Sequence, residues 1–366
     1  MKNRIDATID RLKVSTYQVP TDGPESDGTL EWDSTTLVLV ELHAGNASGL
    51  GFTYASQSTA SLIQEKLQKL VIGRDAMDVQ TAWEVMVNST RNLGRPGITA
   101  MAIAAVDIAL WDLKARLLQL PLVKLLGEVR PGIPAYGSGG FTSYPIERLQ
   151  NQMENWVKCG LRSVKMKVGR DPSLDPARVQ AVREAIGPKA ELFVDANGAY
   201  SPKQALEQAE TFERHEVKWF EEPVVSDDLD GLRMVRDRAP SSMVIAAGEY
   251  GYELVYFRRM LEARAVDVLQ ADATRCAGIT GFLRAGALCE AFLTPLSAHT
   301  APSIHQHPCC ALERACSVEY FYDHYRIEQM FFDGAANPIE GELRPDLSRP
   351  GLGLEFKRAD AQVYGV

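Results

Sequence analysis

Charged side chains recur through the second half of the sequence, and each one lies at the end of a short β-rich run. Three neighbouring strands end in carboxylates, Asp195, Glu221 and Glu249. Parallel barrel strands present their C-terminal ends at one face, so we expect these side chains to converge there. Three unscreened carboxylates repel one another, whereas oxygen ligands with room for water and substrate suit Mg²⁺. An ordinary acid at a strand end explains any one of them, but three in register favour a magnesium site.

Lys165 and Lys167 lie two residues apart, so their side chains share one face of a strand. Val164 and Met166 occupy the other face, which we expect to pack against helices. The lysines are then expected to point into the barrel mouth. Two close ammonium groups lower each other's pKa, which favours a neutral amine base near neutral pH. The alternative is a pair of solvated lysines on an edge strand.

The next strand ends carry Asp272 and His299, and Glu319 follows one helix later. A carboxylate that accepts a hydrogen bond from one imidazole nitrogen fixes the tautomer and leaves the other nitrogen free for proton transfer. We expect His299 and Lys167 to reach opposite faces of a bound carbon acid. Arg275 either contacts a substrate anion or caps its strand, and the sequence favours neither.

Other motifs are weaker. His305 and His307 are two residues apart on an expected helix, so they do not share a face and are interpreted as ordinary helix residues. The sequence contains no Ser-His-Asp order, phosphate-binding loop or dinucleotide fingerprint.

A regular alternation of elements has to position these residues. From about Ile133, short β-rich runs alternate with helical patterns, which is typical of a parallel sheet. Six or more such units favour a (β/α) barrel over an open sheet. The expected strands are 163–168, 192–195, 219–221, 244–247, 268–270 and 292–296. The expected helices are 175–186, 202–215, 229–239, 253–263, 279–290 and 303–316.

In the N-terminal part the expected strands come first and the expected helices follow them, an order that favours an α+β unit. Its expected strands are 5–9, 14–19 and 35–42, with a loop at 20–29, and its expected helices are 58–71, 79–92 and 99–118. The tail 337–366 is rich in Gly and Pro and then β-like, and we expect it to return and pack on the first unit.

Composition excludes several classes of protein. The 366 residues include 39 Lys and Arg against 48 Asp and Glu, a net charge of −9, which argues against nucleic acid or anionic membrane as partners. The longest apolar stretch, 98–111, is too short to span a bilayer and contains Asp107. Residues 1–6 lack the apolar core of a signal peptide. The six cysteines form no Cys-x-x-Cys pair, which favours a reducing cytoplasm over a disulfide framework or zinc site.

Taken together, these motifs resemble the enolase superfamily and, within it, the mandelate racemase subgroup. The matching segments are Lys165-Met-Lys167, 194–198, 220–223, Gly248-Glu249, Ala271-Asp272 with 278–281, Ser297-Ala-His299 and Glu319. The helix 102–115 and the tail segment 349–355 are also similar to the subgroup, so the resemblance covers nearly the whole chain.

The resemblance implies an α/β fold, a (β/α)7β modified TIM barrel with an N-terminal α+β capping domain. We expect the capping domain at 1–125, the barrel at 126–330 and a returning C-terminal segment at 331–366. It also implies a homo-oligomer that binds a small-molecule carboxylate substrate.

Roles follow for each matching position. The resemblance implies that Asp195, Glu221 and Glu249 hold Mg²⁺, that Lys167 is a base, and that Lys165 tunes it and contacts the substrate carboxylate. His299, oriented by Asp272, is the second acid/base. Glu319 is expected to hydrogen-bond a substrate carboxylate oxygen in its protonated form. Glu222 is expected to lie behind the metal ligands.

The reaction that the resemblance implies begins with loss of the proton α to a carboxylate, giving an enediolate. We favour dehydration of a sugar acid to a 2-keto-3-deoxy acid. The alternatives are a racemase or epimerase that uses the Lys167/His299 pair, a cycloisomerase, and a carboxylate-binding barrel without turnover. The expected cap loop 21–32 carries Asp22, Glu25, Asp27 and Glu31, which favours a polyhydroxylated or cationic substrate over a phenyl ring. The alternative for this loop is a solvated turn.

Overall fold

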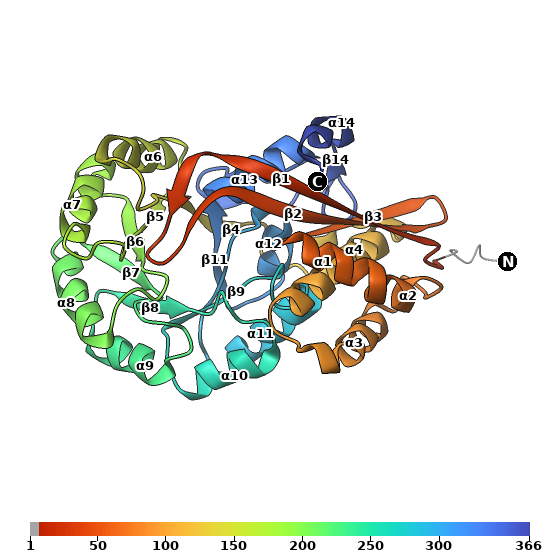
Figure 1. Cartoon of the computed structure of the whole chain (residues 1–366), viewed down its shortest axis with the longest axis horizontal. Helices are drawn as coiled ribbons and strands as arrows, with labels where there is room; N and C mark the ends of the chain where they lie inside the picture. The colour runs from red at the N-terminus through yellow and green to blue at the C-terminus, as the bar shows by residue number, and fades with distance from the viewer. Residues whose placement is uncertain (1–6) are drawn as a thin grey trace.

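Eight parallel strands close into a barrel in the second part of the chain (Figure 1). The computed structural model describes residues 7–366. Each barrel strand pairs with its sequence neighbour, and β11 pairs with β4 to close the ring, so the barrel has no open edge. The barrel strands are β4 (Ile133–Gly139), β5 (Ser163–Lys167), β6 (Glu191–Asp195), β7 (Val217–Glu221), β8 (Val244–Ala247), β9 (Val268–Ala271), β10 (Leu296–Ala298) and β11 (Ala315–Phe321).

Seven helices connect these eight strands and surround the barrel, which confirms the predicted (β/α)7β architecture. They are α6 (Ile146–Lys158), α7 (Asp175–Ile186), α8 (Pro202–Glu213), α9 (Leu229–Arg238), α10 (Leu254–Glu262), α11 (Ile279–Ala291) and α12 (Pro302–Cys310). Strand alternation works as expected on β5, where Val164 and Met166 are fully buried in the core outside the barrel wall.

A three-stranded antiparallel sheet and several helices form the cap. In Figure 1 the hairpin of β1 (Arg11–Ser26) and β2 (Glu31–Ala44) extends across the mouth of the barrel, and β3 (Ala47–Tyr54) completes the sheet. The helical elements that follow are α1 (Gln57–Leu62), a π-helix (Ile63–Leu67), α2 (Gln68–Val71), α3 (Val79–Ser89), a 3-10 turn (Arg91–Leu93), α4 (Ile98–Leu117) and α5 (Leu122–Leu126).

Two glycines of β3 let helix α4 approach the sheet closely. A Cβ atom at Gly51 would lie 2.2 Å from the carbonyl oxygen of Ala105, and one at Gly49 would lie 2.4 Å from that of Ala109. Both neighbours are helix backbone, which cannot move aside as a flexible side chain can. The close packing of α4 on β3 therefore requires glycine at these two positions of the strand.

The C-terminal tail returns to the cap, as the sequence predicted. The backbone N–H of Val366 donates to the carbonyl of Thr16 on β1, and Gly351 bridges Pro121 just before α5. The tail follows α13 (Tyr322–Phe331) and contains β12 (Phe332–Asp333), β13 (Glu342–Leu343), β14 (Glu355–Phe356), α14 (Arg358–Ala361) and a 3-10 turn (Gln362–Tyr364).

Several predicted elements are wrong in extent. The loop expected at 20–29 is mostly strand, because β1 continues to Ser26 after a register shift between Pro20 and Glu25. The helix expected at 303–316 ends at Cys310, and its last residues start β11. The strand expected at 292–296 begins only at Leu296, since Leu293 adopts a left-handed conformation in the turn before it.

Three further strands were not predicted: β3 of the cap, and β4 and β11, which complete the barrel. Part of the N-terminal strand expected at 5–9, and the whole segment 1–6 considered as a leader, lie outside the described residues. Within residues 7–366, no helix has the length and apolar composition needed to cross a membrane.

We predict that Gly51→Ala lowers the free energy of unfolding by about 1–3 kcal/mol, because the added methyl group must displace the backbone of α4. Denaturant titration of both proteins measures the difference. Gly365→Ala is the matched control, because its Cβ would meet only an ordinary contact at 3.4 Å. Equal loss of stability in the two variants would contradict this account of the β3–α4 packing.

Candidate active site

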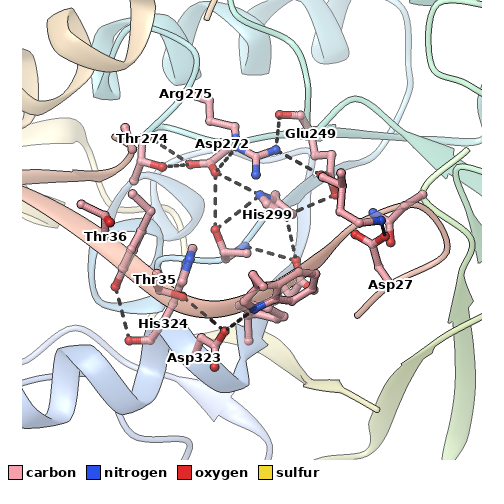
Figure 2. A pocket seen from close by; sticks show the side chains of 18 of the residues that line it. Asp27, Thr35, Thr36, Glu249, Asp272, Thr274, Arg275, His299, Asp323 and His324 are labelled. Atoms are coloured by element: carbon pink, nitrogen blue, oxygen red, sulfur yellow. Dashed lines mark hydrogen bonds and ion pairs between the residues drawn. The ribbon is translucent and has the colours of Figure 1, made fainter. Parts of the chain in front are cut away.

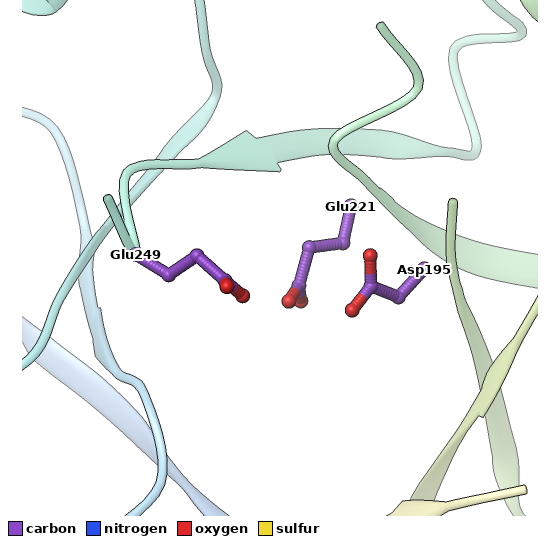
Figure 3. A group of neighbouring side chains, drawn as sticks. All are labelled: Asp195, Glu221 and Glu249. Atoms are coloured by element: carbon purple, nitrogen blue, oxygen red, sulfur yellow. The ribbon is translucent and has the colours of Figure 1, made fainter. Parts of the chain in front are cut away.

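Three carboxylates meet at the C-terminal mouth of the barrel (Figure 3). Asp195 ends β6, Glu221 ends β7, and Glu249 follows β8 by two residues. One oxygen from each lies within 4.8 Å of the others, and all three side chains are buried. Clustered hard oxygen donors of this kind fit a divalent cation such as Mg²⁺, so the convergence expected from the sequence is confirmed.

Two buried lysines partner these acids. Lys165 Nζ lies 2.6 Å from Glu221 Oε1 and 3.7 Å from Asp195 Oδ2, while Lys167 Nζ contacts Asp195 Oδ2. Both ammonium groups point into the barrel, as predicted. The arrangement balances charges that burial would otherwise make very costly.

The predicted direction of the lysine pKa shift is wrong for this structure. Burial and the neighbouring Lys165 both lower the pKa of Lys167, but contact with the Asp195 carboxylate raises it more, so it lies above the ordinary lysine value. The pKa of Lys165 is raised as well, because the charges of Glu221 and Glu319 outweigh its burial. The acids opposite the two lysines, which come from other strands, reverse the effect of one ammonium group on the other.

The neighbouring charges shift the pKa values of the carboxylates in opposite directions. Burial and the charge of Asp195 raise the pKa of Glu221 to about 8. Burial opposes ionisation of Glu249 too, but the charges of His299 and Arg275 hold its pKa well below the ordinary value.

Asp272 and His299 form the expected pair on neighbouring strand ends. His299 Nδ1 lies 3.0 Å from Asp272 Oδ2, and the other oxygen of Asp272 accepts hydrogen bonds from the backbone and side chain of Thr274. Despite its burial, Asp272 has a lowered pKa because His299 bonds to it. His299 Nε2 remains directed at the acid cluster, 3.2 Å from Glu249 Oε2. Asp272 therefore fixes the orientation of the ring.

Glu319 lies in the same cluster but in a different charge state from the one expected. Its Oε1 is 2.9 Å from Lys165 Nζ, and its Oε2 accepts a hydrogen bond from the backbone N–H of Thr300. Burial alone would raise the pKa of Glu319, but the charges of Lys165 and His299 lower it to about 2. The prediction that Glu319 is protonated is therefore wrong, because the contact with Lys165 was not foreseen from the sequence.

These groups surround a cavity of about 420 Å³ between barrel and cap, within the size range of small-molecule sites (Figure 2). Lys167 and His299 both line it. The other lining residues expected from the sequence are Glu249, Asp272, Arg275 and Glu319. Arg275 binds the carbonyl and carboxylate oxygens of Glu249, so it is part of the site and not a simple strand cap.

Some lining or supporting residues were missed. Trp219 donates its indole N–H to Glu221 Oε2 at 3.0 Å, and its position two residues before Glu221 on one strand was the available signal. Trp32, Thr35 and Asp323 also line the cavity, although no strand-end pattern marks them. They come together only because the cap docks on the barrel.

The two helix histidines are structural, as interpreted from the sequence. His305 Nε2 accepts a hydrogen bond from the backbone N–H of Ala273, next to Asp272, and His307 Nε2 bonds the carbonyl of Leu352. Burial lowers the pKa of both rings.

The acidic cap segment 21–32 offers fewer free charges than the sequence suggested. Asp22 pairs with Arg326, and Glu31 pairs with Arg170. Asp27 accepts hydrogen bonds from the backbone of Thr29 and Leu30 within its own turn. These three acids are therefore engaged by partners within the chain.

Comparison with known families agrees with this geometry. Residues 14–127 match the N-terminal domain of the mandelate racemase/muconate lactonizing enzyme family, and residues 148–361 match the enolase C-terminal domain-like family. The chain belongs to the mandelate racemase/muconate lactonizing enzyme family. This confirms the resemblance inferred from the strand-end motifs.

Solved members of the family share the whole fold. A mandelate racemase/muconate lactonizing enzyme-like protein from Rubrobacter xylanophilus is 53% identical, with a TM-score of 0.96 over 98% of this chain and 100% of that one. A racemase from Streptomyces coelicolor, solved with bound magnesium, is 29% identical, with a TM-score of 0.92 over 98% and 100% of the two chains.

Curated relatives cover several activities. A 3,6-anhydro-alpha-L-galactonate cycloisomerase from Streptomyces coelicolor is 31% identical over 98% of this chain and 100% of its own length. An L-talarate/galactarate dehydratase from Salmonella typhimurium is 29% identical over 94% and 88% of the two chains. An arabinonate dehydratase from Saccharolobus solfataricus is 31% identical over 87% and 86%.

We predict that Glu221→Gln weakens Mg²⁺ binding by about 100-fold, because it removes one of three charged oxygen ligands. Isothermal titration of the metal-free protein with Mg²⁺ measures the affinity. The wild-type protein should also gain thermal stability on adding Mg²⁺, whereas the variant should not at the same concentration. Glu191→Gln, at the exposed start of β6, is the matched control and should bind like the wild type. Equal affinities for Glu221→Gln and wild type would refute the assigned site.

Proposed function

We propose that this protein is a magnesium-dependent enzyme that removes the proton α to a carboxylate and dehydrates a sugar acid to a 2-keto-3-deoxy acid. One observation carries the proposal: Lys167 and His299 line the same cavity, beside a buried triad of carboxylates that fits a divalent cation. Two proton-transfer groups around one bound carbon acid are what such a reaction requires.

In this proposal Asp195, Glu221 and Glu249 hold the cation. Bound Mg²⁺ supplies Lewis-acid stabilisation of the negative charge that develops on the substrate carboxylate as the α-proton leaves. Lys165 and Glu319, which contact each other at the base of the cluster, are assigned to the substrate carboxylate. Lys165 adds a fixed positive charge, and a buried, preorganised charge stabilises such a transition state better than water does.

Lys167 is assigned as the base that removes the α-proton. It must be neutral to do so, and the Asp195 carboxylate is the partner that holds it protonated. A cation held by Asp195 would share the charge of this carboxylate with Lys167 and would so favour the neutral amine.

His299 is assigned as the acid in the second half of the reaction. Its ring is held by Asp272 through Nδ1, so Nε2 is the atom that donates a proton to the β-hydroxyl group. The β-carbon–oxygen bond then breaks, water leaves, and the resulting enol becomes the 2-keto acid. The α-proton ends on Lys167 and the leaving oxygen takes its proton from His299, so the protons balance.

The choice of a sugar acid rests on two supports. Two of the relatives described above are named as dehydratases of talarate/galactarate and of arabinonate, which are acids of sugars. The cavity is also lined by hydroxyl groups from the cap, among them Thr35 and Thr36, which can hydrogen-bond a polyol.

A second candidate is racemisation or epimerisation by the same pair of groups. It is supported by the placement of both Lys167 and His299 at the cavity and by the racemase name of one structural neighbour. A cycloisomerase is the third candidate, since the leaving β-oxygen can belong to a ring. A carboxylate-binding barrel without turnover is the least favoured, because all eight positions that match the family's site motifs carry functional side chains. The predicted domain boundaries, homo-oligomeric assembly and cytoplasmic location stay predictions.

The activity test is incubation with Mg²⁺ and a panel of sugar acids in D₂O, followed by mass spectrometry and proton NMR. We expect one member to lose water and form a 2-keto-3-deoxy acid. Solvent deuterium at the α-carbon without water loss would favour the racemase or epimerase instead. If no member of the panel exchanges its α-proton, the proposed function is wrong.

We predict that Lys167→Ala lowers α-proton exchange of one C2 epimer by about 1,000-fold or more, because the proton on that face loses its base. His299→Asn should instead preserve exchange by Lys167 while slowing water loss by a similar factor. NMR exchange rates and keto-acid formation, measured on the same samples, separate the two effects. Intact activity of Lys167→Ala on every substrate would contradict the assignment of the base.

A further inference from the structure

At the cap end of the cavity, Asp323 lines the wall and Glu25 lies buried behind it, and the two carboxyl groups share one donor. The indole N–H of Trp32 lies 3.1 Å from Glu25 Oε2 and 3.2 Å from Asp323 Oδ2. Glu25 comes from β1 of the cap, whereas Asp323 lies in the first turn of α13 from the barrel. Both are buried, at 0% and 1% exposure, so water does not screen them. Tyr144 also donates its hydroxyl to Glu25 Oε1, but Asp323 Oδ1 has no hydrogen-bond partner among the described residues, so the wall keeps an unused acceptor.

This wall has no cation of its own. Among residues 7–366, no ion pair involves Glu25 or Asp323. The nearby Arg326 is bound to Asp22 and to the carbonyl of Pro20. Burial and the charge of Asp323 raise the pKa of Glu25 to about 9, so Glu25 keeps its proton near neutral pH.

Hydroxyl groups cover the cavity side of the wall. Thr35 Oγ1 donates to Asp323 Oδ2 at 3.4 Å, and Ser34 and Thr36 line the cavity on either side of it. Figure 2 shows Thr35 and Thr36 with Asp323 at the cap side of His299, and Asp272 and Arg275 on its other side. A hydroxyl ligand can donate to the carboxyl oxygens and accept from these side chains.

The cations of the cavity lie at its other end. Of the described residues that line it, Lys167 and Arg275 are the lysines and arginines, and each is bound to carboxylates of the acid cluster. The imidazole of His324, stacked on Tyr54 with ring centroids 3.4 Å apart, has a pKa well below its ordinary value because it is buried. The cap end therefore offers no positive charge to a ligand.

We infer that the cap end of the cavity binds the uncharged, hydroxylated end of a monocarboxylic sugar acid, an aldonate, and rejects a second carboxylate there. The inference rests on the proposed function and narrows its substrate class. A terminal carboxylate placed against Asp323 would lose its hydration without gaining a cation and would face acceptor oxygens instead of donors. A terminal CH₂OH group meets hydrogen-bond acceptors in the same place.

The test compares matched pairs of an aldonate and an aldarate with equal carbon number and the same configuration at every shared centre. We expect kcat/KM of the wild-type protein with Mg²⁺ to favour the aldonate by about 100-fold. Exchange of the α-proton in D₂O is recorded for both acids. An equal or greater kcat/KM for the aldarate overturns the inference and leaves the proposed function standing. Absence of α-proton exchange with every sugar acid overturns both.

A pair of variants assigns the preference to this wall. The double variant Glu25→Gln/Asp323→Asn removes both acids with little change in shape, and we expect the aldonate-to-aldarate ratio to fall about tenfold. Asp22→Asn/Glu31→Gln is the matched control, because it removes two acids from the same hairpin that do not line the cavity. If the aldonate-to-aldarate ratio is the same in the two double variants, the assignment of the preference to Glu25 and Asp323 is wrong. The comparison of the two acids on the wild-type protein tests the substrate class without any variant.

Discussion

The concentration of like charge at the barrel mouth is the constraint on which the rest of this structure depends. Asp195, Glu221 and Glu249 place ligand oxygens within 4.8 Å of one another in a buried site. Such a cluster is tolerable only with compensating positive charge, and the chain provides it internally through Lys165 and Lys167. Parallel strands make this possible, because each contributes one side chain to the same end of the barrel. The strand ends of an open sheet lie along a line and do not surround one point as those of a closed barrel do.

The cap does more than cover the site. Thr53 of β3 donates its hydroxyl to the carbonyl of Thr274, and Trp83 of α3 donates its indole N–H to the carbonyl of Ala277. Both bonds hold the turn that follows Asp272. Farther along the same connection, Asp107 of α4 accepts the backbone N–H and the hydroxyl of Thr280 at the start of α11. The orientation of the Asp272–His299 pair therefore depends on the cap as well as on the barrel.

Much of the barrel and its site could be predicted from the sequence, because their signals are local. A period of two places Lys165 and Lys167 on one face, and regular strand–helix spacing places each acid at a strand end. Charge states were not predictable in this way. The raised pKa of Lys167 and the lowered pKa of Glu319 arise from partners on other strands. The wall around Asp323 was also invisible, because its members are brought together only by docking of the cap hairpin on α13.

The internal lysines also link stability to chemistry. In the folded chain Lys165 bridges Glu221 and Glu319, so removing either charge leaves a buried group without its partner, a loss of several kcal/mol in typical cases. A cation held by the acid triad would share the Asp195 oxygen that Lys167 now contacts. Binding free energy and the cost of activating a buried amine are then parts of one equilibrium. A barrel mouth arranged this way holds Lys167 protonated through the same carboxylate that a cation would bind.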